Sequence, residues 1–147
     1  MTEILTRKME EDDIPAVLKI ERVSFSTPWS EYSFLTEIYK KYAFTRVALS
    51  EGNIIGYICV NFVLYEAHIL NLAVDPDFRR RGVATLLMDE ALRELKNKNC
   101  VFIYLEVRVS NTGAREFYEG FGFKPAGIRK KYYASPNEDA LLMMGRI

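Results

Sequence analysis

The chain has 147 residues, 49% hydrophobic and 27% charged, and its 20 basic residues balance its 20 acidic residues. This length predicts one domain over residues 1–147 that folds without disulfides or a metal. The sequence shows neither an apolar run of about 20 residues nor a secretory signal, which excludes a membrane span and favours the cytoplasm. The balanced charge excludes a general attraction to nucleic acid or acidic membranes.

The N-terminal half is predicted to contain helices and then strands. Acidic residues before Pro15 and apolar residues after it predict a first helix that ends near residue 23. Ser30 is expected to cap a second helix over residues 31–40, so that two helices precede any strand. Runs of β-branched and aromatic residues then predict three consecutive antiparallel strands, at residues 44–49, 54–64 and 67–74.

The C-terminal half alternates between helix and strand patterns. Apolar residues at helical spacing predict an amphipathic helix over residues 82–98. The remaining predicted elements are a strand at 100–107, a short helix at 111–120, a strand from 123 onward and a strand near 140–144. Together the elements indicate one mixed α/β layer fold in which helices cover a sheet.

The cysteines and the histidine bear on metal and redox chemistry. Cys59 and Cys100 each lie inside an apolar run, which predicts buried free thiols rather than a disulfide. One histidine and two scattered cysteines cannot supply a zinc cluster, so we expect no metal site.

The most informative segment is residues 74–85 (VDPDFRRRGVAT), where a predicted strand ends in a basic loop that opens the long helix. Unpaired N–H groups and the positive end of the helix dipole favour an anion there, and three arginines add charge, so a phosphate-bearing ligand is indicated. An ordinary solvated helix start remains the alternative. The loop lacks the G-x-G-x-x-G and GK[ST] patterns of dinucleotide and nucleoside triphosphate sites.

The pattern R-x-x-G-x-A at residues 79–84 (RRRGVA) resembles the pyrophosphate-binding motif of GNAT acetyltransferases. Residues 105–111 (LEVRVSN) and 117–123 (FYEGFGF) resemble the second half of that family. Three further segments narrow the resemblance to its ribosomal-protein-alanine acetyltransferase subfamily: 27–31 (TPWSE), 66–71 (EAHILN) and 127–140, with GIRKKYY and EDA. The resemblance implies the GNAT acyl-CoA N-acyltransferase fold, an α/β (α+β) fold with a mixed, mostly antiparallel sheet and helices on both faces.

The resemblance implies acetyl-CoA as cosubstrate and assigns residues to it. Backbone groups of the predicted third strand are expected to line the pantetheine arm, and the basic loop is expected to hold the pyrophosphate. Asn111 matches a family residue that contacts the cofactor, although capping of the following helix is an equal alternative. The complete predicted cofactor set is Leu72, Ala73, Val74, Arg79, Arg80, Arg81, Gly82, Val83, Ala84, Thr85 and Asn111.

Two residues are predicted to carry proton transfers. Glu106 ends an otherwise apolar strand, where a charge is costly unless it faces an opening. An exposed strand end is the alternative, and the resemblance makes Glu106 the general base. Tyr118 by default is a packed tyrosine, and by resemblance it donates a proton to the departing thiolate. His68 has an unperturbed pKa near neutrality, but we interpret it as a strand-facing or hydrogen-bonded histidine rather than the base.

Trp29, Tyr132 and Tyr133 resemble the two flanks of the family's substrate groove, and packing in the core is the alternative for each. The resemblance implies a protein N-terminus as acceptor, an alanine of a ribosomal protein. A GNAT enzyme for lysine side chains or a small amine is one alternative function, because the fold hosts many acceptors. A non-catalytic acyl-CoA-binding module is the other, and it would be indicated by loss of Glu106, Tyr118 or the Gly82 loop.

Overall fold

The computed structural model describes residues 3–147 and confirms the predicted mixed α/β fold. Within that span the α-helices are α1 Ile14–Ser24, α2 Glu31–Tyr39, α3 Val83–Asn97 and α4 Thr112–Glu119. The strands are β1 Ile4–Lys8, β2 Ala43–Ser50, β3 Asn53–Val63, β4 Glu66–Val74, β5 Phe102–Arg108, β6 Lys124–Ala134 and β7 Asn137–Arg146. Two short 3-10 helices, Glu11–Asp13 and Pro76–Phe78, precede α1 and follow β4.

The prediction that two helices precede any strand is wrong, because β1 comes before α1. This strand pairs antiparallel with β2, from Ile4 opposite Ser50 to Lys8 opposite Arg46. It has five residues, three of them polar or charged, and it lies at the edge of the sheet. Such a strand depends on backbone pairing with a partner about forty residues away, and no local apolar alternation marks it.

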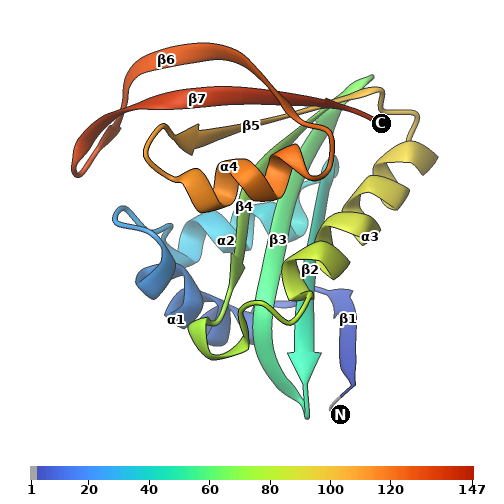
Figure 1. The fold of residues 1–147 in the computed structure, drawn as a ribbon. Coiled ribbons are helices and arrows are strands. Elements are labelled where there is room, and N and C mark those ends of the chain that lie inside the picture. The colour runs from blue at the N-terminus through green and yellow to red at the C-terminus, as the bar shows by residue number, and fades with distance from the viewer. Residues whose placement is uncertain (1–2) are drawn as a thin grey trace.

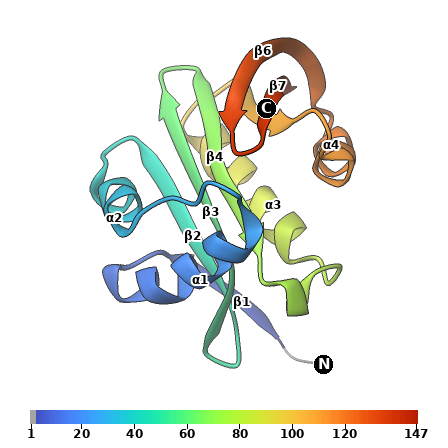
Figure 2. The ribbon, with the colours of Figure 1, turned by 90° about the vertical axis from the view of Figure 1, so that its left-hand side faces the viewer.

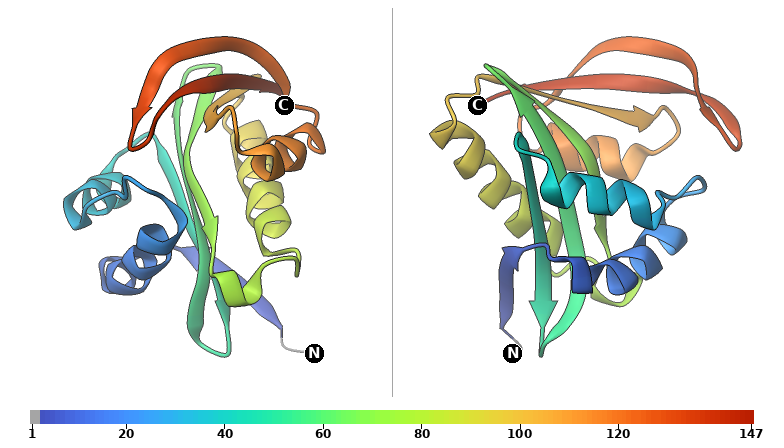
Figure 3. Two further views of the ribbon diagram at one scale, coloured as in Figure 1. Left: turned by 60° about the vertical axis from the view of Figure 1, so that its left-hand side comes forward. Right: turned by 180° about the vertical axis from the view of Figure 1, so that it is seen from behind.

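The strands form one seven-stranded sheet in the order β1-β2-β3-β4-β5-β7-β6. The pair β4 and β5 is parallel, and every other neighbouring pair is antiparallel. Figure 1 and Figure 2 show α1 and α2 on one face of the sheet and α3 and α4 on the other. Figure 3 shows the β6–β7 hairpin arching over one end of this three-layer arrangement. The predicted mostly antiparallel sheet with helices on both faces is therefore confirmed.

Each face of the sheet has its own apolar core. Val17, Phe34 and Tyr57 are fully buried between the sheet and the pair α1 and α2. On the other face, Leu87 and Ile103 belong to a larger cluster that joins α3, α4 and the sheet. Burial of this apolar surface fixes both helix pairs against the strands, at roughly 25 cal/mol per Å² removed from water.

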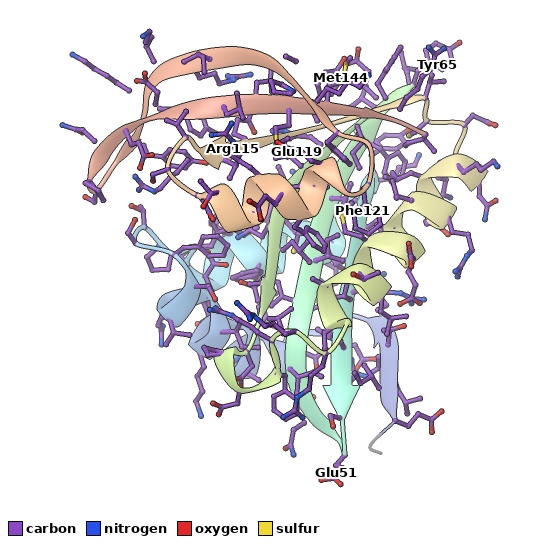
Figure 4. All side chains as sticks on the ribbon, viewed as in Figure 1. Glu51, Tyr65, Arg115, Glu119, Phe121 and Met144 are labelled. Carbon is purple, nitrogen blue, oxygen red and sulfur yellow. The ribbon has the colours of Figure 1, made fainter. Side chains whose placement is uncertain are left out.

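Several local predictions are confirmed. The Ser30 side chain accepts a hydrogen bond from the Ser33 amide at 3.2 Å and so caps α2. Both cysteines are buried and free. Figure 4 places Glu51 at the β2–β3 turn and Tyr65 at the β3–β4 turn, at opposite ends of the sheet.

Over residues 3–147, no helix combines the length and the apolarity needed to cross a bilayer.

Candidate active site

The sheet opens between its two parallel strands. β4 and β5 pair only over three residues each, from Glu66 opposite Phe102 to His68 opposite Tyr104, and then diverge. A register shift in β4 at the same point leaves Leu70 without a partner on β3. A bulge of this kind re-aims backbone groups, and bulges are common beside active sites. The divergence forms a cavity of about 390 Å³.

The cavity brings together predicted residues that are far apart in the sequence. Its walls come from the end of α1, the α1–α2 loop, β4, β5, α4 and the end of β6. The predicted site residues that line it are Trp29, Leu72, Glu106, Asn111, Tyr118, Tyr132 and Tyr133. Ala73, Val74 and residues 79–85 do not line it and lie further along the chain, at the end of β4, in the following loop and in the first turn of α3.

Glu106 lies at the centre of a charged cluster. Its side chain is only 7% exposed, with one carboxylate oxygen 2.5 Å from His68 Nε2 and the other 3.3 Å from Arg129 Nε. Burial raises the pKa of Glu106, but the hydrogen bond and charge of His68 and the charge of Arg129 outweigh burial and lower it. The carboxylate is therefore ionised at neutral pH and able to accept a proton. His68 is hydrogen-bonded, as predicted.

This geometry predicts the effect of replacing His68. Because His68 stabilises the ionised form of Glu106, His68→Gln should raise the pKa of that carboxyl. At a given acidic pH a smaller fraction of Glu106 would then be deprotonated, so the acid limb of the pH profile of kcat should move to higher pH. Profiles measured at saturating concentrations of both substrates test this, because kcat reports groups in the bound complex. An unmoved acid limb would contradict the assignment of Glu106 as the base.

Tyr118 extends from α4 toward the same cavity. Its ring is 8% exposed, lies edge-on to Phe117 at 5.2 Å and is tilted against Phe123 at 5.6 Å. Burial raises the pKa of Tyr118 above its usual value, and the charge of the nearby Tyr133 adds a smaller effect in the same direction. The hydroxyl therefore keeps its proton at neutral pH, which is the form that a proton donor needs.

The predicted substrate flanks combine packing with exposure to the cavity. Trp29 packs its ring 5.1 Å from Phe34, and its backbone amide donates to Glu21 at 2.8 Å. Tyr132 and Tyr133 lie edge to face at 5.1 Å. Burial and the charges of Tyr132 and Glu106 raise the pKa of Tyr133 to about 12. Trp29 therefore packs against the apolar core and also forms part of the cavity wall.

The basic loop leads from β4 into α3. Gly82 precedes the first helical residue with φ of 80°, in the left-handed region that favours glycine. Arg79, Arg80 and Arg81 are exposed, but the side chains of Arg79 and Arg81 also contact neighbouring residues. Arg79 Nε donates to the carbonyl of Val74 at 3.1 Å, and the Arg81 guanidinium lies 5.1 Å from the centre of the Phe78 ring. The loop thus presents cations beside the free N–H groups of a helix start, an arrangement that fits a pyrophosphate.

Asn111 caps α4, since its side-chain oxygen accepts a hydrogen bond from the Ala114 amide at 3.1 Å. The capping alternative is therefore confirmed, and contact with the cofactor stays a prediction. Because Asn111 also lines the cavity, the two roles do not exclude each other.

Two charged residues that line the cavity, Glu21 and Arg108, are not among the predicted site residues. Glu21 is 1% exposed and accepts hydrogen bonds from the Trp29 amide, from Asn71 Nδ2 at 2.9 Å and from the Tyr57 hydroxyl. Glu21 lies four residues after Val17, on the apolar side of α1, and a charged residue on that side is the feature of the sequence that could have indicated it. Arg108 follows Glu106 by two residues on the same face of β5, a signal of strand periodicity.

The fold and the cavity together define a class of protein. A mixed sheet that opens between two parallel strands, with helices on both faces and a basic loop at a helix start, is an acyl-CoA N-acyltransferase architecture. Residues 14–123 match the Acetyltransferase (GNAT) family. The chain therefore belongs to the GNAT acetyltransferases and is an acetyl-CoA-dependent N-acetyltransferase.

Named relatives are similar over most of the chain. The ribosomal protein bS18-alanine N-acetyltransferase of Salmonella typhimurium is 38% identical over 133 residues, which cover 89% of each chain. The crystal structure of the ribosomal-protein-S18-alanine N-acetyltransferase from Escherichia coli has a TM-score of 0.91 at 33% identity, covering 99% of this chain and 94% of that one. One chain in the crystal structure of the NatC complex bound to Gag peptide and CoA has a TM-score of 0.87 at 26% identity, covering 99% of this chain and 99% of that one.

Proposed function

We propose that this enzyme acetylates the N-terminal α-amino group of a protein, an alanine of a ribosomal protein, in the cytoplasm. The observation that carries the proposal is one cavity that holds Glu106 and Tyr118 beside the aromatic residues Trp29, Tyr132 and Tyr133. The names of the relatives from Salmonella typhimurium and Escherichia coli, which specify an alanine of S18, support this acceptor.

The proposed reaction is direct transfer. The neutral amine of the acceptor attacks the thioester carbon, which forms a carbon–nitrogen bond and a tetrahedral oxyanion. The oxyanion then collapses, and the carbon–sulfur bond breaks. Glu106 accepts the amine proton through a water molecule, and Tyr118 gives its hydroxyl proton to the departing thiolate sulfur. A backbone N–H of β4 beside the bulge at Leu70 stabilises the oxyanion. The two proton transfers leave the reaction balanced without an acyl-enzyme.

The low pKa of Glu106 favours an α-amine over a lysine. An α-amino group has a pKa of about 8 and a lysine side chain one of about 10.4, so at neutral pH the α-amine is neutral roughly two hundred times more often. A carboxylate whose pKa is lowered by His68 and Arg129 is a weak base, and it suffices only for an amine that is already partly neutral.

Acetyl-CoA is proposed to bind from the side of α3 and α4. Backbone groups of Leu72, Ala73 and Val74 would line its pantetheine arm, with Asn111 at the start of α4. Residues 79–85 would hold the pyrophosphate through arginine side chains and the N–H groups of the first turn of α3.

Replacing Arg80 and Arg81 together by alanine should weaken acetyl-CoA binding by about tenfold or more, since charge-assisted hydrogen bonds to phosphate are each worth about 1.5–3 kcal/mol. The salt dependence of binding should also fall. Both arginines are exposed, and the contact of Arg81 with Phe78 is a weak surface contact, so the melting temperature of the free enzyme should fall by no more than a few degrees. Calorimetric titration with acetyl-CoA measures the effect, and unchanged affinity would show that the pyrophosphate lies elsewhere.

The acceptor is tested with three amines offered alongside acetyl-CoA. They are a peptide that starts with alanine, the same peptide blocked at its N-terminus but containing a lysine, and spermidine. The proposal predicts the highest kcat/KM for the free alanine peptide. A higher value for the blocked peptide or spermidine would establish the lysine or small-amine alternative, and acetyl-CoA binding without turnover of any amine would indicate a non-catalytic module.

A further inference from the structure

Arg108, at the end of β5, joins two loops that are distant in the sequence. One terminal nitrogen, Nη2, donates to the Ser26 hydroxyl at 2.9 Å and to the Ser135 carbonyl at 3.1 Å. The other, Nη1, donates to the Pro136 carbonyl at 2.8 Å and lies 3.3 Å from a Glu138 oxygen. Ser26 belongs to the α1–α2 loop, Ser135 and Pro136 form the β6–β7 turn, and Glu138 is the second residue of β7. One guanidinium therefore spans both sides of the cavity.

The same guanidinium also fixes an aromatic wall of the cavity. Its central carbon lies 4.4 Å from the centre of the Tyr133 ring, within the range of a cation–π interaction. Arg108, Ser26 and Tyr133 all line the cavity that contains Glu106. The position of the Tyr133 ring therefore depends on the contact that holds the two loops together.

An arginine is required for this arrangement. Its planar fork can donate to four acceptors in fixed directions, which the single ammonium of a lysine cannot reproduce. The opposing carboxylate is itself held, because the second oxygen of Glu138 accepts from the Ser110 amide at 2.7 Å. Without the guanidinium, the α1–α2 loop would still be anchored by Glu21 at Trp29, but it would have no side-chain hydrogen bond to the β6–β7 turn among the described residues.

We propose that Arg108 is a positioning residue that sets the width of the acceptor groove and thereby restricts the first residue of the acceptor to a small side chain. This inference rests on the proposed acetylation of protein N-termini. It makes the preference for alanine a property of the distance between two loops, because no side chain needs to recognise the alanine methyl group.

The test compares peptides that begin with alanine, serine, methionine or leucine and are otherwise identical. Arg108→Met should raise the ratio of kcat/KM for the methionine peptide to that for the alanine peptide by on the order of tenfold, the scale of discrimination that one or two methylenes provide in a pocket. Arg108→Lys should restore the ratio only in part. The KM for acetyl-CoA should stay unchanged in both variants. A general disruption of the fold would raise it.

A milder variant and a matched control complete the experiment. Ser26→Ala removes only the contact with the α1–α2 loop from an exposed residue, so it should fold normally and shift the ratio in the same direction by less. Arg146→Met removes a similar arginine–aromatic contact, with Phe102 at 5.6 Å, at the opposite end of β5, and should leave the ratio unchanged.

An unchanged ratio in both Arg108→Met and Ser26→Ala, with the alanine peptide still acetylated, would overturn the inference and leave the proposed function intact. A wild-type enzyme that acetylates none of the four peptides would instead refute the proposed function.

Discussion

Replacing Glu106 by glutamine should lower kcat by about a hundredfold, the usual contribution of a positioned general base. Glutamine has nearly the same shape and can keep a hydrogen bond to His68, but its amide cannot accept a proton. The protein should therefore fold, and its affinity for acetyl-CoA should stay within a few-fold of the wild-type value. Steady-state rates with the alanine peptide and calorimetric titration with acetyl-CoA measure the two effects separately.

Glu94→Gln is the matched control for this substitution. Glu94 lies on α3 with a loose ion pair of 4.0 Å to Lys98, outside the cavity. It should keep the wild-type kcat. If Glu106→Gln also keeps it, Glu106 only organises the cluster with His68 and Arg129, and water or His68 becomes the candidate base.

The helices and strands that could be predicted best are those marked by a residue pattern within their own segment of the sequence. The helix over 82–98 was predicted because its apolar residues recur at helical spacing, and α3 spans Val83–Asn97. The strands β2, β3 and β4 follow from β-branched runs separated by turn residues. β1 was missed because its stability comes from pairing with β2, and a pairing partner leaves no mark on the five residues themselves.

Seven of the predicted site residues line one cavity, but the sequence does not show how the residues of that cavity are connected. Resemblance supplied Glu106 and Tyr118, yet nothing in their spacing shows that β4 and β5 part after three paired residues and open a cavity between them. The hydrogen bonds of Glu21 and Arg108 join segments up to 82 residues apart, and such contacts exist only in the folded chain. The charge environment that lowers the pKa of Glu106 likewise depends on Arg129, from β6.

The surroundings of the cavity favour the protonation states that the proposed base, Glu106, and the proposed acid, Tyr118, need. His68 and Arg129 favour the ionised form of Glu106, whereas burial among aromatic rings favours the neutral form of Tyr118. Two titratable groups with pKa values pushed in opposite directions are typical of an acid and base pair. Glu106 lies on β5 and Tyr118 on α4, and this separation matches the two places where the proposed reaction takes up and releases protons.

Replacing Tyr118 by phenylalanine should lower kcat by about a hundredfold and leave the fold intact. Phenylalanine keeps the ring that packs between Phe117 and Phe123 and removes only the hydroxyl, so the melting temperature should change by no more than a few degrees. Tyr65→Phe, at the exposed β3–β4 turn, is the control and should have the wild-type kcat.

A second acetyl donor separates an acid from a packing residue at position 118. Protonation matters less as the departing thiol becomes more acidic, because the thiolate is then stable without a proton. With an acetyl thioester of a more acidic thiol, the rate ratio of wild type to Tyr118→Phe should therefore fall well below its value with acetyl-CoA. A ratio that is equally large for both donors would show that the hydroxyl positions the substrate and transfers no proton, because a positioning defect would slow both donors alike.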